Sequence, residues 1–286
     1  MDVYTNINMI PFNPKQRLKL IQQYDLKFGM HPTTQQGQDA YRELNKINLD
    51  GSERIYRIYS WDRFKDLLHT KTDSLVPTYK WDDPFENFIL GSKAIYEGNV
   101  VDLQQVRNSW YGQCWSLTEE SDGLWRTYTE YSHQQHKIAV KVSTTVDKLF
   151  NNLYDFSNKF HAISFFIGKV EYVDKNDILQ ILSQDLGPAV LNSDNIFMAL
   201  SLFIKRKEFR YEDEVRILYN HYDSRSLPNV YSYNLDPNTI FDEIVVDPWT
   251  DLKSYTQIEN EIKASGYARP VSLSDLYAPN NSIITI

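Results

Sequence analysis

Two glutamates separated by one residue, Glu212 and Glu214, are the side chains whose type and spacing point most directly to chemistry. From residue 212 onward polar and apolar residues alternate, which predicts a strand with Glu212, Glu214 and Arg216 on one face. Two adjacent carboxylates repel each other and destabilise a sheet unless a cation or a reaction uses them. A pair of carboxylates can stabilise the oxocarbenium-like state of glycosidic cleavage and accept a proton.

The same charges also have a structural interpretation. The two glutamates and Arg216 can form a solvated strand face that is held by salt bridges to neighbouring strands. Arg57 lies on a predicted strand over residues 55–59, where it can pair with Glu214 and hold two strands together. The sequence by itself leaves both interpretations open.

For two further charged motifs the preferred interpretation is structural. The run Asp83-Pro84-Phe85-Glu86 has the residues of a helix start, with Asp83 as the cap and Glu86 closing a capping box. The basic run Lys205-Arg206-Lys207 is expected to be a solvated face. Its alternative role is contact with an anionic target such as a nucleic acid.

Composition narrows the class of protein. The 286 residues suffice for one large domain or two small ones, and the formal net charge of −8 argues against broad nonspecific nucleic-acid binding. The single cysteine, Cys114, excludes an intramolecular disulfide and favours the cytoplasm. No signal peptide and no membrane span are expected. His133 and His136 have metal-like spacing without an accompanying Cys or carboxylate motif, so no metal site is expected.

Short helices and strands follow one another without strict βαβ order, which predicts the α+β class. Residues 1–50 are expected to form a helical accessory segment, and residues 51–286 a single α+β domain, with a turn near residue 50 as the boundary. Strands are predicted over residues 55–59, 113–117, 138–142, 165–173, 212–219 and 240–246. Helices are predicted to begin near residues 60, 82 and 121 and to cover residues 145–157, 195–205 and 251–265.

Several blocks between residues 52 and 250 together resemble DUF2971, a bacterial family of uncharacterised domains. The matching blocks are Ile55–Ser60, Trp81–Glu86, Cys114-Trp115-Ser116, Leu124–Tyr128 and Lys207–Arg216. One residue departs from the family pattern, because Asp82 stands where the family has Asn. This resemblance implies a fold more than an activity.

The order of three of these motifs also resembles the ADP-ribosyltransferase superfamily. That superfamily carries an Arg or His on a first strand, a Ser-Thr-Ser-like segment on a second and Glu-x-Glu on a third. Arg57, Ser116-Leu117-Thr118 and Glu212-Asp213-Glu214 follow the same order, but the third hydroxyl of the middle motif is missing. The resemblance implies a split mixed or antiparallel sheet with flanking helices.

The same resemblance implies NAD as the substrate, without a metal. Glu214 would stabilise the positive charge on the ribose, and Glu212 would orient or deprotonate the acceptor, although the two glutamates can trade roles. Ser116 would brace Glu214 by a hydrogen bond. The residues expected to bind NAD are Arg57, Tyr59, Ser116, Thr118, Trp125, Tyr128, Phe209 and Tyr211, with Tyr128, Phe209 or Tyr211 stacking on the nicotinamide ring.

The expected function is therefore transfer of ADP-ribose to a macromolecule, either a protein or a nucleic acid, or hydrolysis of NAD. Such activities commonly serve as toxins or in anti-phage defence. The resemblance therefore also implies a cognate inhibitor or partner protein that binds this one. The alternative is a noncatalytic binding or interaction module on the same fold. In that case residues 1–50 would be a partner-docking arm.

Overall fold

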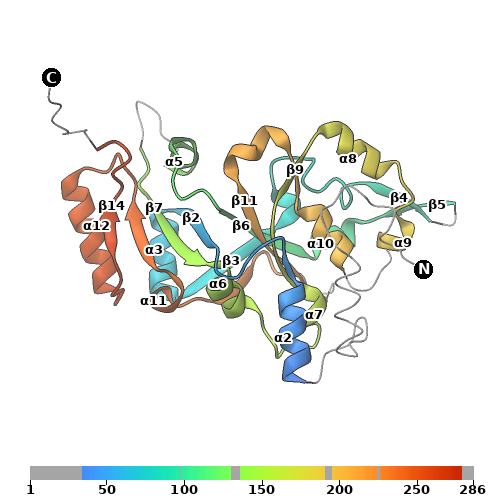
Figure 1. The fold of residues 1–286 in the computed structure, drawn as a ribbon, viewed down its shortest axis with the longest axis horizontal. Coiled ribbons are helices and arrows are strands. Elements are labelled where there is room, and N and C mark those ends of the chain that lie inside the picture. The colour runs from blue at the N-terminus through green and yellow to red at the C-terminus, as the bar shows by residue number, and fades with distance from the viewer. Residues whose placement is uncertain (1–33, 97, 130–135, 191–194, 224–225, 279–286) are drawn as a thin grey trace.

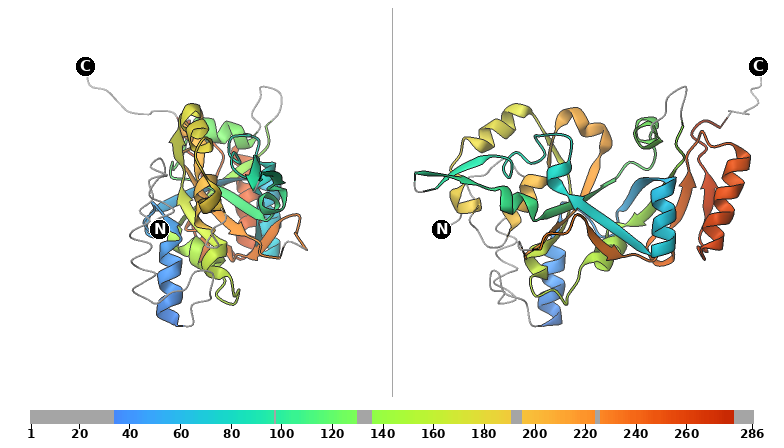
Figure 2. Two further views of the ribbon diagram at one scale, coloured as in Figure 1. Left: turned by 90° about the vertical axis from the view of Figure 1, so that its right-hand side faces the viewer. Right: turned by 180° about the vertical axis from the view of Figure 1, so that it is seen from behind.

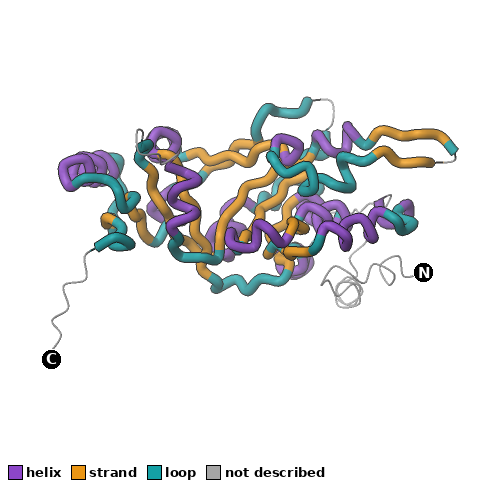
Figure 3. Tube along the Cα trace, turned by 90° about the horizontal axis from the view of Figure 1, so that it is seen from above, coloured by secondary structure: helices purple, strands orange, loops and turns teal. Residues whose placement is uncertain are grey.

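The computed structural model describes residues 34–96, 98–129, 136–190, 195–223 and 226–278 (Figure 1). The molecule is elongated, with α12 (Leu252–Ala264) and β14 (Val271–Leu273) at one end and the hairpin β4 (Lys93–Tyr96) and β5 (Asn99–Asp102) at the other (Figure 1). Seen from above, this hairpin extends beyond the helices beside it (Figure 3). Within the described ranges no helix is both long and apolar enough to cross a membrane.

A mixed sheet forms the centre of the molecule (Figure 2). Its strands follow the order β1 (Lys46–Ile47), β8 (Phe165–Lys169), β11 (Glu214–Asn220), β6 (Trp110–Ser116), β2 (Arg54–Ser60), β7 (Ala139–Thr145), β13 (Glu243–Val246) and β14. The pairs β1–β8 and β13–β14 are parallel, and the other pairs along this path are antiparallel. Strand β3 (Thr72–Pro77) pairs with β6 and with β12 (Tyr231–Asn234), while β9 (Glu171–Val173) and β10 (Ile204–Arg206) form a small parallel sheet.

Short helices flank the sheet. They are α2 (Gln35–Leu44), α3 (Trp61–Thr70), α4 (Gln104–Asn108), α5 (Asp122–Thr129), α6 (Val146–Leu153), α7 (His161–Ser164), α8 (Lys175–Leu182), α9 (Gly187–Val190), α10 (Ile196–Leu202) and α11 (Pro237–Ile240). Two 3₁₀ turns, η1 (Thr78–Lys80) and η2 (Lys207–Glu212), complete the chain. The expected α+β class, with a mixed sheet and flanking helices, is confirmed.

The sheet splits between β2 and β6. Strand β2 pairs with β7 along its whole length, from Arg54 to Ser60, but meets β6 at a single pair, Tyr56 with Ser116. Strand β6 is instead held along its length by β11, from Ser116 to Trp110. The two halves therefore diverge beside Tyr56 and leave side chains from both halves facing a shared gap.

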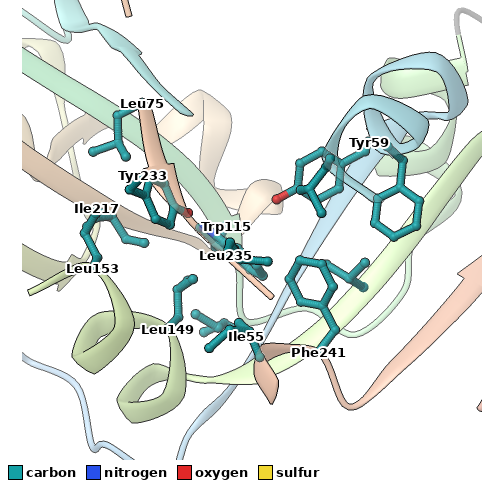
Figure 4. Packing of buried hydrophobic residues seen from close by; sticks show 14 of the residues in the cluster. Ile55, Tyr59, Leu75, Trp115, Leu149, Leu153, Ile217, Tyr233, Leu235 and Phe241 are labelled. Atoms are coloured by element: carbon teal, nitrogen blue, oxygen red, sulfur yellow. The ribbon is translucent and has the colours of Figure 1, made fainter. Parts of the chain in front are cut away.

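The core follows from strand alternation. Ile55 and Tyr59 of β2 point to one face of the sheet, where they pack with Phe64 of α3 and Leu149 of α6 (Figure 4). A second apolar cluster covers the other face at the β11 end, where Leu218 packs against the apolar helix α10. Removal of apolar surface from water stabilises such clusters by roughly 25 cal/mol per Å².

The last helix of the chain has the predicted bounds, because the signals for its two ends lie in adjacent residues. The last helix, α12, begins after Asp251, whose side chain accepts hydrogen bonds from the backbone N–H groups of Lys253 and Ser254. It is followed by Gly266 at a φ of 91°, a conformation that glycine adopts without strain. Both helix ends were predictable because the signals lie within a few residues of the element.

Three predicted elements differ from the structure. The predicted helix over residues 195–205 ends at Leu202, because residues 204–206 form β10 and pair with β9. Glu212 does not lie on the strand: it ends the 3₁₀ turn η2, Asp213 adopts a left-handed φ of 39°, and β11 begins only at Glu214. The expected helix near residue 82 is replaced by turns. Asp83 Oδ1 accepts from the backbone N–H of Phe85, as in a cap, but no helix continues from it.

Residues 34–50 contact the sheet directly. Strand β1 extends its edge beside β8, and Asn45 Nδ2 donates to the carbonyl oxygens of Ala162 and Phe165 at 2.9 and 2.8 Å. Residues 1–33 of the predicted helical accessory segment lie outside the described residues. The boundary between the two predicted domains stays a prediction.

Candidate active site

A cleft lies where the sheet splits, with about 470 Å³ of free space when its open mouth is included. It is lined by Tyr56, Arg57, Ile58, Cys114, Trp115, Ser116, Thr118, Glu119, Glu120, Ser121, Leu124, Tyr128, Lys141, Glu212 and Glu214. The structure therefore brings Arg57, Ser116, Glu212 and Glu214 to one cleft, although they come from three separate parts of the chain.

Lys205 joins the two glutamates that line the cleft. Its Nζ lies 2.6 Å from Glu212 Oε2, 3.3 Å from Glu214 Oε2 and 2.9 Å from Glu86 Oε1. The side chain of Lys205 is 9% exposed, so these pairs form away from bulk water. Repulsion between the glutamates is thus offset by a buried cation rather than by solvent.

Arg216, two residues after Glu214 on β11, binds two of the same carboxylates. Its Nη2 lies 2.9 Å from Glu86 Oε1 and 2.8 Å from Glu214 Oε2. Its Nη1 donates to the carbonyl of Leu202 at 2.6 Å, and its guanidinium carbon lies 4.3 Å from the centre of a Trp81 ring. Three carboxylates and two cations thus form one group, which we call the buried ion cluster: Glu86, Glu212, Glu214, Lys205 and Arg216.

The cluster shifts the two glutamate pKa values in opposite directions. Burial raises the pKa of Glu212 above its usual value, and hydrogen bonding to Lys205 opposes this only in part. Burial would also raise the pKa of Glu214, but Arg216 and Lys205 outweigh it and lower that pKa. Glu214 is therefore held ionised, while Glu212 is the carboxylate better suited to accept a proton near neutral pH.

Hydrogen bonds to the backbone fix the positions of Glu212 and Glu214. Ser116 Oγ donates to the carbonyl of Glu212 at 2.6 Å and accepts from the backbone N–H of Thr118 at 3.0 Å. The backbone N–H of Glu214 donates to the hydroxyl of Tyr172 at 2.9 Å. The predicted bond from Ser116 to the Glu214 carboxylate is therefore wrong, because the hydroxyl holds the backbone of the turn between the glutamates.

Arg57 lies at the split between β2 and β6. Its Nη1 donates to the carbonyl of Cys114, and its guanidinium carbon lies 5.0 Å from the ring centre of Tyr59. Among the described residues no carboxylate lies within ion-pair distance of Arg57, so the alternative in which it pairs with Glu214 is not what the structure shows. Arg57 thus lines the cleft without an ion-pair partner among the described residues. Burial alone would lower its pKa, but Tyr59 and the charge of the buried Asp73 raise that pKa from the core side.

Four residues that were predicted to bind the cofactor lie away from the cleft. Tyr59 faces the core and donates to Asp73 at 2.8 Å, because it follows Arg57 by two positions on the inward face of β2. Trp125 is fully buried against Ile58 and Ala139, so stacking on a ligand is excluded for it in this arrangement. Phe209 and Tyr211 belong to the η2 turn outside the cleft lining, and only Tyr128 of the aromatic candidates lines it.

Sequence reasoning missed Glu86 and Lys205. Glu86 does not close a capping box, since its carboxylate reaches Lys205 and Arg216 instead. Lys205 is not on a solvated face, because β10 pairs with β9 and turns this side chain inward. The sequence did carry a signal for Glu86. The block Trp81–Glu86 resembles a family pattern over more residues than a helix cap needs, which favours a role beyond capping.

The remaining candidates for chemistry have structural partners. Burial raises the pKa of the Cys114 thiol well above its usual value, and the charge of Glu214 adds to the effect, so this cysteine is a poor nucleophile. His136 Nε2 lies 2.8 Å from Asp247 Oδ1, while His133 lies outside the described residues. Within the described part of the chain, no three His, Cys, Asp or Glu side chains are grouped to hold a metal ion.

Comparison with known proteins gives structural matches alone. No protein-family model matches the chain, and no curated protein matches its sequence. Thermus sp. 2.9 DarT in complex with NAD⁺ is 10% identical, with a TM-score of 0.37, and the match covers 79% of this chain and 98% of that one. The same protein in complex with ADP-ribosylated ssDNA is 13% identical, with a TM-score of 0.35, covering 80% of this chain and 97% of that one. We therefore derive the chemistry of the cleft from its own residues.

Proposed function

We propose that this protein cleaves NAD and transfers ADP-ribose to a macromolecular acceptor or to water. One observation carries the proposal: Glu212 and Glu214 line the same cleft as Arg57, and their pKa values are shifted in opposite directions. An ionised carboxylate beside a proton-accepting carboxylate is the pair that substitution at an anomeric carbon requires.

In the first step the bond between ribose C1′ and the nicotinamide nitrogen breaks. The electron pair leaves with the ring, which departs as neutral nicotinamide, and positive charge develops on the ribose. Glu214 is placed to stabilise that charge, since its carboxylate is already ionised and fixed by Arg216 at 2.8 Å. A preorganised charge of this kind needs no reorientation during the reaction.

In the second step an acceptor hydroxyl, amine or water attacks C1′. A bond forms between the acceptor atom and C1′, and the proton of the acceptor passes to Glu212. The raised pKa of Glu212 suits this role, and its side chain is 24% exposed, compared with 3% for Glu214. These differences favour Glu214 as the residue that stabilises the charge on the ribose and Glu212 as the base.

The rest of the cleft supplies binding groups. Arg57 would hold phosphate or ribose oxygens through its planar fork, and Tyr128, which is partly exposed at the cleft, would stack on the nicotinamide ring. Ser116 and Thr118 line the side nearest the glutamates. Since DarT is known with ADP-ribosylated ssDNA, single-stranded DNA is the first macromolecular acceptor to test.

The proposal also covers the family of this protein and its biological role. The blocks that resemble DUF2971 are far apart in sequence, but they place Arg57, Cys114, Tyr128 and Glu214 around one cleft. Membership in that family is part of the proposal. We place the activity in a toxin or anti-phage setting, where a cognate inhibitor would protect the host.

A noncatalytic binding module is the second candidate, and one observation favours it. The carboxylate of Glu214 is 3% exposed and is already paired with both Arg216 and Lys205. A carboxylate in that state can serve to hold the ends of β10 and β11 together. In that case the cleft would bind a nucleotide without cleaving it.

Release of free nicotinamide from NAD separates the two candidates. The purified protein, Glu214→Gln, Glu212→Gln and Glu171→Gln are compared, the last being an exposed glutamate outside the cleft. If the protein is an enzyme, we expect nicotinamide release by the wild type and by Glu171→Gln, and loss of release in the two cleft variants while circular dichroism shows that they are folded. Calorimetric binding of NAD without release, tested with single-stranded DNA and with protein acceptors present, would support the binding module.

A further inference from the structure

Lys141 is a buried cation without an acidic partner. It lies on β7, is 4% exposed and lines the cleft. In the part of the chain that the structure describes, its Nζ forms no ion pair and no hydrogen bond, and its contact is the ring of Tyr56, 5.7 Å from Nζ to the ring centre. Sequence analysis did not single out this residue.

Its situation differs from that of the other buried cations at the cleft. Lys205 and Arg216 are surrounded by carboxylates at 2.6 to 3.3 Å. The side chain of Lys141 is largely buried, and contact with an aromatic ring offsets part of the free energy that is lost when its charge leaves water. An ammonium group kept in this state is suited to an anion that comes from outside the chain.

Strand register places Lys141 on the same face of the sheet as Glu214. Glu214 pairs with Ser116, Ser116 with Tyr56, and Lys141 with Ile58, which is two positions from Tyr56. Three strand spacings and two residues along a strand put the Cα atoms of Lys141 and Glu214 roughly 15 Å apart. Lys141 is thus at the opposite end of the cleft from the reacting carboxylates.

The groups that face Lys141 leave room for an anion. Glu120 is engaged by Trp125 Nε1 at 2.8 Å and by the hydroxyl of Ser274. Glu119 is exposed at the rim, where water screens its charge. Arg57 lies on the strand that pairs with β7, opposite Val142, so its side chain starts on the other face of the sheet from Lys141. It enters the cleft lining at the split between β2 and β6, where its Nη1 donates to the carbonyl of Cys114.

We propose that Lys141, together with Arg57, binds the diphosphate of a dinucleotide that lies along the cleft with its scissile ribose toward Glu214. Two cations that have no ion-pair partner among the described residues match the two negative charges of a diphosphate. The assignment rests on the proposed function for the identity of the nucleotide, whereas the diphosphate chemistry rests on Lys141 and Arg57 themselves. Lys141 is then a positioning residue, because it touches the substrate far from the bond that breaks.

Calorimetric titration with ADP-ribose and with inorganic pyrophosphate tests the assignment. Lys141→Met removes the charge at similar length, Lys141→Arg keeps it, and Lys253→Met on exposed α12 is the matched control. We expect Lys141→Met to weaken binding of both probes by roughly ten- to a hundredfold, as loss of a charge-assisted hydrogen bond does. Lys141→Arg should recover most of the affinity, and adenosine, which lacks phosphate, should bind all variants alike.

Stability supplies a readout that is independent of any ligand. An unpaired buried cation that is replaced by methionine should leave the melting temperature unchanged or raise it, whereas loss of a hidden structural ion pair would lower it. Should Lys141→Met fold poorly, the titration is repeated with Lys141→Gln. Unchanged affinity for ADP-ribose in a folded, charge-free variant overturns the proposal.

The remaining outcomes are also decisive. Wild-type protein that binds neither pyrophosphate nor ADP-ribose overturns the diphosphate site. Binding of both probes without any NAD cleavage leaves the site standing while the proposed enzymatic function fails. Loss of oligothymidylate binding in Lys141→Met, with ADP-ribose affinity unchanged, would assign the lysine to an acceptor phosphate and overturn the dinucleotide assignment.

Discussion

Lys205 donates to Glu212 across 2.6 Å, so the carboxylate proposed to accept a proton is held in an ion pair before any substrate arrives. The same ammonium group contacts Glu86 and Glu214. Lys205 therefore neutralises the site and fixes the distance between its two glutamates. Its burial makes the pair far less sensitive to salt than a surface ion pair would be.

Lys205→Met should destabilise the protein by about 3–5 kcal/mol, because it leaves buried carboxylates without their shared cation. Urea unfolding at pH 7 measures the change, and Lys253→Met, at an exposed lysine, should stay within about 0.5 kcal/mol of the wild type. A loss below about 1 kcal/mol for Lys205→Met would show that the cluster is better hydrated than its burial indicates.

The rate of transfer should rise with pH through the pKa of Glu212. Burial raises that pKa above the usual glutamate value of about 4.3, and the residue accepts a proton in its ionised form. The acidic limb of the kcat/KM profile should therefore lie above that value. A limb that persists unchanged in any residual activity of Glu212→Gln would assign it to another group.

Glu86→Gln should move this acidic limb to lower pH. The charge of Glu86 contributes to the raised pKa of Glu212, and glutamine keeps an oxygen that can accept from Lys205 and Arg216. The shift is read from pH–rate profiles of the two proteins, and Glu171→Gln, outside the cleft, should not shift the limb. No shift in Glu86→Gln would mean that Glu86 is electrostatically isolated from the base.

Glu86 also shows where prediction from sequence stops. Its local motif satisfied the rules for a helix start, and those rules concern residues within one turn of each other. Its actual partner, Arg216, is 130 positions away in the chain, so the contact depends on the packing of turns against a distant strand. By contrast, both ends of α12 depend on adjacent residues and were predicted correctly.

The glutamate pair shows a second limit. Period-two alternation predicted that Glu212 and Glu214 share one strand face, but the left-handed Asp213 separates a 3₁₀ turn from β11. Both carboxylates still reach Lys205, so the expected proximity arises by a different route. Lys141 was not singled out from the sequence, and its place at the cleft depends on the pairing of β7 with β2.

Ser116 offers a test of the turn that carries Glu212. Its hydroxyl donates to the Glu212 carbonyl at 2.6 Å and accepts from the Thr118 N–H, so Ser116→Ala loses both bonds and leaves buried backbone groups unpaired. We expect a loss of about 1–3 kcal/mol in unfolding free energy and a lower kcat, since the base is less well placed. The Kd for ADP-ribose should be nearly unchanged, because the phosphate-binding cations are untouched.

Thr127→Ala is the control for Ser116→Ala, since Thr127 bonds a carbonyl of its own helix on an exposed face. It should leave kcat and Kd at wild-type values. Ser116→Thr restores a hydroxyl and should recover kcat where the added methyl group is accommodated. A fall in ADP-ribose affinity equal to the fall in kcat would instead place Ser116 in direct contact with the nucleotide, and its role would be binding rather than support of the turn.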